Sequence, residues 1–178
     1  MKFERTAIAG VWIVDLDPRA EERGFFARTF CRGEFAAHGL HTDWPQGNVS
    51  RNTRRGTLRG LHFQDAPHPE IKLVRCTAGA IFDVAVDVRR GSPTFGRWTG
   101  VELSAATGRA LYIPAGCAHG FQTLTDDAEI FYMMGDSYFP ELARGVRWDD
   151  PTIAVKWPLP PVALSPRDAA LPLLSALA

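Results

Sequence analysis

The segment GRALYIPAGCAHG, residues 108–120, decides the fold class of this chain. In it a short apolar run, ALYIPA, leads directly into a turn-rich run, PAGCAHG, that contains a histidine. Strand-length apolar runs and turn signals such as WPQGN, RRGSPTFG and TDDAE alternate in the same way on both sides of the segment. Short strands separated at close intervals by turns predict an all-β sandwich or barrel.

The predicted strands are rich in β-branched and aromatic residues: VWIVDL (11–16), GFFARTF (24–30), IKLVRCTA (71–78), AIFDVAVDV (80–88), RWTGVELS (97–104), ALYIPA (110–115), GFQTL (120–124) and EIFYMM (129–134). In AIFDVAVDV a period of two places Phe82, Val84 and Val86 on one face and Asp83 and Asp87 on the other. This alternation predicts a strand with one well-buried face.

Helix is scarce in the predicted fold. RGEFAAHGL (32–40) predicts one short helix that ends at Gly39. The Pro-rich and then Ala/Leu-rich tail, residues 157–178, is expected to pack across the sandwich as irregular chain plus a short helix. We expect residues 1–178 to form a single domain, since no repeat or low-complexity linker divides them.

Composition narrows the function classes. Lys+Arg and Asp+Glu both number 20, so no net charge favours nucleic acid or an acidic membrane surface. We therefore expect no nucleic-acid or membrane partner, and the chain shows neither a signal peptide nor an apolar run long enough to span a membrane. Cys31, Cys76 and Cys117 are widely spaced and odd in number, which favours a reduced, cytoplasmic setting with each thiol acting as a buried small hydrophobe.

The opening segment also carries a signature of the cupin fold. Gly108, Pro114, Gly116 and His119 match the spacing G-x5-P-x-G-x2-H, the second signature of cupins. We therefore predict an all-β cupin jelly roll, the double-stranded β-helix, with a few short helices.

The first cupin signature, which carries most of the metal ligands, is incomplete. It starts correctly at Gly56 and His62, but Gln64 stands where a second histidine belongs and Glu70 comes too late. Because a catalytic metal generally needs three protein ligands, we expect no metal site, and a metal-dependent oxygenase is the weaker alternative.

Without a metal, His62 is the natural general base, because an unperturbed imidazole has a pKa of roughly 6.5. A lone histidine is more often a core residue, however. Lys72 can be a solvated strand residue, Tyr132 a core residue and Tyr138 the cover of a loop. The alternation of RGLHFQ (59–64) separates Arg59 from His62. Both can line one pocket only if Arg59 reaches around the mouth or the strand is irregular at Gly60.

Six longer motifs resemble one enzyme family. They are RGFFARTF (23–30), GTLRGLHFQ (56–64), KLVRCTAGAIFDVAVDVRRGSPTFGRW (72–98), LYIPAGCAHGFQTL (111–124), RGVRWDDPTIAVKWP (144–158) and LSPRD (164–168). Together they identify the chain as a member of the dTDP-4-dehydrorhamnose 3,5-epimerases. The resemblance implies a metal-free and cofactor-free jelly-roll homodimer that acts on a nucleotide-linked 4-keto-6-deoxyhexose.

The resemblance also implies catalytic roles. His62 would remove the proton next to the ketone and Asp168 would pair with it. Tyr132 would return a proton from the opposite face. Lys72, helped by His119, would stabilise the enolate oxygen.

On the substrate-binding side, the resemblance implies that Arg59 and Arg23 grip the diphosphate. Gln46 and Asn48 would contact the nucleotide side, and Tyr138 would stack on the base.

The chain departs from the family pattern on this side. Arg28 and Ala143 stand where family members acting on the rhamnose precursor carry Glu, and the segment 46–62 is one residue longer. The extra cation at Arg28 leaves open a different nucleotide, a different sugar, or inversion at C3 only. The expected function is therefore C3 and C5 epimerisation, with a 3-monoepimerase, an epimerase of another nucleotide sugar, and a non-catalytic sugar-nucleotide-binding cupin as alternatives.

Overall fold

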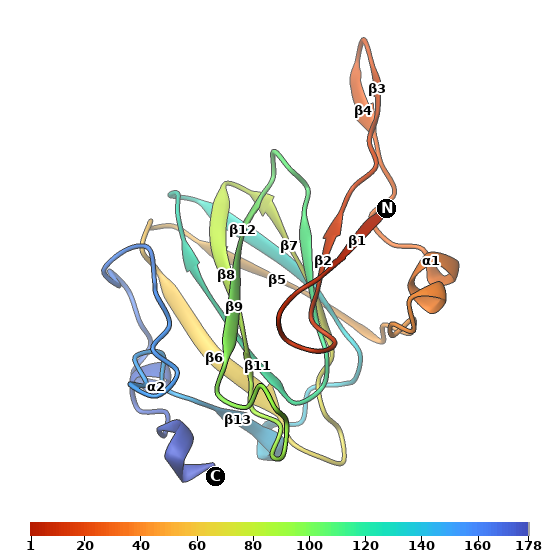
Figure 1. The fold of residues 1–178 in the computed structure, drawn as a ribbon. Coiled ribbons are helices and arrows are strands. Elements are labelled where there is room, and N and C mark those ends of the chain that lie inside the picture. Colours follow the sequence, from red (N-terminus) through yellow and green to blue (C-terminus); the bar gives the residue numbers. More distant parts are fainter. Residues whose placement is uncertain (178) are drawn as a thin grey trace.

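Two antiparallel sheets packed face to face form the body of the protein in the computed structural model, which describes residues 1–177 (Figure 1). One sheet has the strand order β1 (Lys2–Arg5), β2 (Trp12–Asp15), β10 (Ala110–Ile113), β7 (Lys72–Ala78), β12 (Ala128–Met134) and β5 (Gln46–Asn52). The other has the order β13 (Ala143–Gly145), β6 (Leu58–Gln64), β11 (Cys117–Thr123), β8 (Ala80–Asp87) and β9 (Trp98–Ser104). The predicted all-β cupin jelly roll is confirmed.

The remaining elements are short. Strands β3 (Arg19–Glu21) and β4 (Gly24–Phe26) pair as a hairpin that projects from the body (Figure 1). The helices are α1 (Arg32–Ala37) and α2 (Pro166–Ala169), with 3-10 turns η1 (Pro140–Leu142) and η2 (Leu174–Ala176). Gly39 follows α1 with φ +68°, a left-handed conformation that ends the helix as predicted. Among residues 1–177, no helix has the length and apolarity that a membrane crossing requires.

The core lies between the sheets, where side chains such as Val74 and Ile130 meet Ile81 and Phe121. The outer face of the five-stranded sheet is also covered, because Val84 and Val86 pack in one cluster with Ile153, Leu174 and neighbouring side chains of the C-terminal segment. Both faces of β8 are therefore buried, and the prediction of a single buried face was wrong. Ala178, the last residue of the predicted tail, lies outside the described residues.

The other differences from the predicted strands also have local causes. GFFARTF forms a strand only over Gly24–Phe26, since Phe30 leaves the hairpin to pack edge-on against Phe35 of α1. Strand β5 escaped prediction because its sequence, QGNVSRN, carries little apolar patterning, although it pairs with β12 along its whole length.

The predicted burial of the cysteines holds for Cys76 and Cys117 but not for Cys31, which is half-buried at the N-cap position of α1. Burial raises the pKa of Cys76 to about 11 and that of Cys117 to about 12. Both thiols therefore stay protonated and unreactive near neutral pH.

Candidate active site

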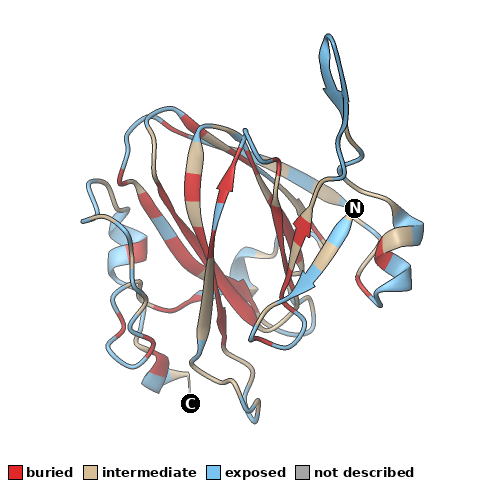
Figure 2. Ribbon diagram, turned by 45° about the horizontal axis from the view of Figure 1, so that its top comes forward, coloured by how far each residue is buried: buried red, intermediate tan, exposed pale blue. Residues whose placement is uncertain are grey.

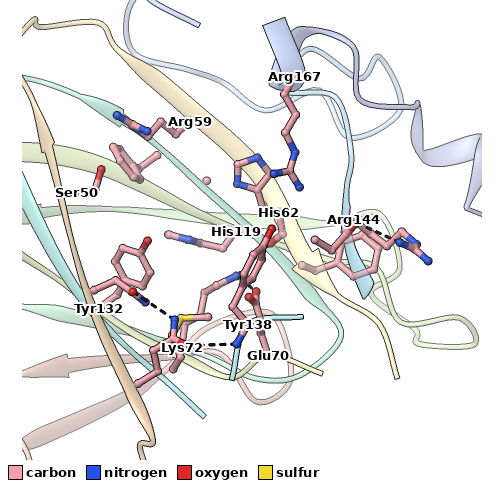
Figure 3. A pocket seen from close by; sticks show the side chains of 17 residues that line it. Ser50, Arg59, His62, Glu70, Lys72, His119, Tyr132, Tyr138, Arg144 and Arg167 are labelled. Atoms are coloured by element: carbon pink, nitrogen blue, oxygen red, sulfur yellow. Dashed lines mark hydrogen bonds and ion pairs between the residues drawn. The ribbon is translucent and has the colours of Figure 1, made fainter. Parts of the chain in front are cut away.

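A cavity of about 350 Å³ opens between the two sheets and collects most of the predicted site residues (Figure 3). Strands β5, β12 and β7 line one side, and β6 and β11 line the other. The polar side chains on its wall are Gln46, Asn48, Ser50, Arg59, His62, Glu70, Lys72, His119, Tyr132, Tyr138, Arg144 and Arg167.

His62 reaches the cavity from β6 and is held by Asp168 of α2. The His62 Nε2 atom lies 2.7 Å from Asp168 Oδ1, and the backbone N–H of Gly60 donates to Asp168 Oδ2 at 3.2 Å. Burial disfavours the ionised form of Asp168, but the hydrogen bonds from His62 and Gly60 outweigh it, so the pKa of this carboxyl lies below its ordinary value. An ionised Asp168 accepts the Nε2 proton and leaves the Nδ1 lone pair of His62 free to act as a base.

Strand β6 is irregular at Gly60, which places both Arg59 and His62 on the cavity wall. Gly60 has φ +124°, and a Cβ atom there would lie 2.5 Å from the Cα of Gly120 on β11. The pairing of β11 with β6 shifts register between His119 and Phe121, opposite this point. Only glycine permits this approach, and the irregularity breaks the strict alternation that would have turned Arg59 away from His62.

Lys72 begins β7, and its ammonium is almost completely enclosed. Its Nζ lies 2.5 Å from Glu70 Oε2 and donates to the backbone carbonyl of His62 at 3.3 Å. The side chains of Lys72 and Glu70 are only 7% and 9% exposed, so this is a buried ion pair at the cavity wall.

Tyr132 faces the cavity from β12, across from β6. Burial raises the pKa of its phenol, and the negative charge of Glu70 raises it further, against a smaller opposite effect from Arg59. Tyr132 therefore holds its proton more firmly than an exposed tyrosine does.

His119 and Gln64, the other residues of the cupin signatures, are both held by protein groups. His119 Nε2 lies 2.7 Å from Asp83 Oδ1. Gln64 donates to the carbonyls of His68 and Ser137, and it accepts from the N–H of Phe139. Gln64 therefore ties together two loops beside the cavity, and among residues 1–177 no group of three or more His, Cys, Asp or Glu side chains is placed to hold a metal ion.

The predicted substrate-binding residues divide into two groups. Gln46, Asn48, Arg59 and Tyr138 line the cavity, and the N–H of Tyr138 donates to Gln46 Oε1 at 3.2 Å. Arg59 is fixed by Asn52, whose Oδ1 accepts from Arg59 Nε at 2.7 Å.

Arg23 and Arg28, which were also expected to bind the substrate, lie outside the cavity of their own chain. Arg23 sits at the turn of the projecting hairpin, 84% exposed and paired with Glu21. Arg28 pairs with Glu34 of α1 at 3.4 Å. The hairpin that carries Arg23 projects from the body of the chain and is exposed over residues 19–26 (Figure 2).

Sequence reasoning missed four polar residues of the wall: Ser50, Glu70, Arg144 and Arg167. Two of them had a usable signal. Glu70 stands two residues before Lys72, the spacing that puts side chains on one side of an extended chain. Arg167 directly precedes Asp168 in LSPRD.

Comparison with known proteins agrees with this site. A family model described as dTDP-4-dehydrorhamnose 3,5-epimerase matches residues 5–176. The chain belongs to this family. The prediction made from the motifs is therefore confirmed, and the protein is an isomerase of the epimerase class.

Individual relatives align over nearly the whole chain. A dTDP-4-dehydrorhamnose 3,5-epimerase from Sinorhizobium fredii is 44% identical, over 99% of this chain and 91% of its own. The crystal structure of a dTDP-6-deoxy-D-glucose-3,5-epimerase from Legionella pneumophila in complex with dTDP-4-keto-L-rhamnose is 41% identical, with a TM-score of 0.93 over 99% of this chain and 94% of that one. A 3'-monoepimerase from Streptomyces bikiniensis in complex with dTDP-quinovose is 36% identical, with a TM-score of 0.89 over 96% of this chain and 86% of that one.

Arg28 and Ala143, the two residues that depart from the expected family pattern, lie in different parts of the structure. Ala143 lies on the cavity wall beside Arg144, whereas Arg28 lies outside it. Ala143 therefore forms part of the cavity wall, and Arg28 does not.

Proposed function

We propose that this epimerase inverts C3 and C5 of dTDP-4-dehydro-6-deoxy-D-glucose and forms dTDP-4-dehydro-L-rhamnose. One observation carries the proposal: His62, with a free ring nitrogen, and the Lys72 ammonium open into one cavity, and Tyr132 lines its other side. The names of the relatives, which include 3,5-epimerases, support the choice of substrate class.

The first step removes a proton from the carbon next to the ketone. A ketone acidifies that C–H bond, but an imidazole is still too weak a base unless the enolate oxygen is stabilised. The Nδ1 atom of His62 takes the proton, Asp168 stabilises the imidazolium that forms, and Lys72 donates to the oxyanion. His119 helps Lys72 as a second donor only when it is an imidazolium, because Asp83 already accepts from its Nε2 atom.

Inversion requires that the proton returns to the opposite face of the carbon. Tyr132 lies on the sheet that faces β6, and its raised pKa keeps the phenol protonated as a donor. Tyr132 gives its proton to the carbon, and solvent then restores the phenol and removes the proton from His62. The same cycle at the second carbon completes the reaction, and no step uses a metal or a cofactor.

The nucleotide part is held at the cavity mouth. Arg59 meets the diphosphate, because a guanidinium fork matches phosphate oxygens, and Gln46 and Asn48 contact the nucleotide side. Tyr138, which is 47% exposed at the rim, stacks on the base.

Solvent deuterium tests the proposed reaction. We expect dTDP-4-keto-6-deoxyglucose, incubated with the protein in deuterated water, to acquire deuterium at both C3 and C5, since each carbon is reprotonated by a group in exchange with solvent. NMR and mass spectrometry of the product locate the label. Labelling at neither carbon would show that the substrate is wrong.

A 3-monoepimerase is the second candidate. It is favoured by the similarity to the Streptomyces bikiniensis 3'-monoepimerase and by the alanine at position 143 of the cavity wall. Label at C3 alone would identify this activity.

We further propose that the working form is a cytoplasmic homodimer. Phe25 and Phe26 on the projecting hairpin are 58% and 70% exposed, and Val49 and Phe131, paired across β5 and β12, are exposed on the six-stranded sheet. A two-fold axis that lays the hairpin of each copy on the β5–β12 surface of the other buries both apolar surfaces. The hairpin also brings Arg23 to the strand that lines the other copy's cavity, where it meets the diphosphate.

Light scattering on the purified chain tests this arrangement. We expect twice the mass of one chain, and a shift toward the single mass when Phe25 and Phe26 are both replaced by serine, because the apolar contact is lost. Val162→Ser, at an exposed apolar residue of the C-terminal segment, is the matched control and leaves the mass unchanged. A monomeric unmodified protein would contradict the proposal.

A further inference from the structure

Glu70 occupies an unusual place in the cavity. The wall carries the cations Arg59, Lys72, Arg144 and Arg167, and Glu70 is the one carboxylate among the described residues that line it. The carboxylates of Asp168 and Asp83 hold His62 and His119 through ring nitrogens and do not line the cavity themselves. Glu70 is therefore the carboxylate that lies at the cavity wall itself.

The contacts of Lys72 show what the carboxylate does to its geometry. An ammonium has three N–H donors. One points to Glu70 Oε2 at 2.5 Å, and a second points to the carbonyl of His62 at 3.3 Å, so two fixed acceptors orient the group. The third donor is left for an oxygen of the substrate. Figure 3 shows Lys72 and Glu70 side by side at the cavity wall.

The charge of Glu70 also reaches Tyr132. Burial raises the pKa of the phenol and Glu70 raises it further, because a second negative charge nearby is unfavourable, while Arg59 acts in the opposite direction. The other titratable or charged groups on the cavity wall are His62 on β6, Lys72 on β7, His119 on β11, Arg144 on β13, Tyr138 in the loop after β12 and Arg167 on α2.

We propose that Glu70 is a positioning residue, whose carboxylate aims the Lys72 ammonium at the substrate oxygen and places a negative charge on the cavity wall that Tyr132 also lines. This rests on the proposed function, since the oxygen is that of the enolate and the phenol is the proton donor. It adds a third acidic residue, after Asp168 and Asp83, that controls a catalytic side chain.

Two variants separate the geometric role from the charge. Glu70→Ala removes the acceptor and the charge together, whereas Glu70→Gln keeps an oxygen that accepts from Lys72 and removes only the charge. Glu102→Gln, on an exposed position of β9, is the matched control for loss of one surface charge. Circular dichroism establishes that each variant is folded.

We measure kcat and KM across pH. Glu70→Ala is expected to lower kcat about 10- to 100-fold with little change in KM, because the Lys72 ammonium loses the acceptor that orients it toward the substrate. Glu70→Gln regains most of kcat at the optimum. In both variants the alkaline limb of the kcat profile moves to lower pH, because the phenol loses its proton more easily without the charge of Glu70.

A second readout does not depend on the reaction. The chain has three tyrosines, so labelling their Cζ atoms with carbon-13 gives three NMR signals, and Tyr132→Phe assigns one of them. We expect the Tyr132 signal to titrate at lower pH in Glu70→Gln than in the unmodified protein, and to stay unchanged in Glu102→Gln.

The two proposals fail in different ways. An unmodified protein that exchanges no deuterium into the substrate refutes the proposed reaction, whatever the NMR titration shows. An active protein refutes the inference if folded Glu70→Ala keeps the parent kcat, or if the Tyr132 titration is the same in Glu70→Gln as in the parent.

Discussion

Replacing His62 with alanine is expected to abolish deuterium exchange at both C3 and C5, with a loss of about 10²–10⁴ in rate. The effect is large because the side chain of His62 is 39% exposed, whereas the other imidazole on the wall that is bound to an aspartate, His119, is only 9% exposed. The hydrogen bond from His62 Nε2 to Asp168 fixes the tautomer that leaves Nδ1 unprotonated, and Glu70 is already bound to Lys72. Proton NMR of the substrate in deuterated water measures the exchange directly.

Tyr132→Phe is the matched control for this experiment. It removes the donor on the opposite side of the cavity but leaves His62 and Lys72 in place, so deprotonation continues. We expect slow epimerisation with substantial wash-out of label, in contrast to His62→Ala, which shows neither. Because His62→Ala leaves the buried Asp168 carboxylate without its imidazole partner, thermal unfolding must establish that the variant is folded. Full exchange in His62→Ala would assign the base to another residue.

Sequence patterns predicted the fold well because the strands of a jelly roll can be recognised from alternating apolar residues and from the turn residues between them. The two exceptions, β8 and β5, share a cause, because each depends on contacts with a segment that is distant in the sequence. Strand β8 has two buried faces only because the C-terminal segment packs on it. Strand β5 pairs with β12 along its length despite a polar sequence, and nothing in QGNVSRN itself encodes that neighbour.

The site was predictable in its identities and not in its geometry. Family motifs placed His62, Lys72, Tyr132 and Asp168 together, and the structure brings the first three to one cavity with Asp168 bonded to His62. Strict alternation, however, would have separated Arg59 from His62, and only the close approach at Gly60 shows why it does not.

Glu70 and Arg23 were the hardest residues to place. Glu70 was judged only as a failed metal ligand, because the sequence shows its nearness to Lys72 but not that both side chains are enclosed at the cavity wall. Arg23 was expected to contact the diphosphate, and the hairpin places it outside the cavity of its own chain. Only the proposed homodimer gives it a route to that contact.

Replacing Lys72 with methionine is expected to lower kcat by about 10²–10³, because the donor that stabilises the enolate oxygen is lost while the side chain keeps its length. The same change leaves the Glu70 carboxylate buried without its partner. Breaking a buried ion pair on one side typically costs about 3–5 kcal/mol in free energy of unfolding. The variant should therefore be both slow and unstable, and the two effects must be separated.

The double variant with Lys72→Met and Glu70→Gln separates them. It removes both charges of the pair, so we expect most of the free energy of unfolding, measured by urea denaturation, to return. We expect kcat to stay low, because no ammonium faces the substrate. If stability recovers and activity does not, Lys72 takes part in the chemistry. If the ion pair were needed only for folding, the double variant would recover both. Recovery of kcat in the double variant would instead show that the enolate is stabilised by another donor on the cavity wall, such as a protonated His119.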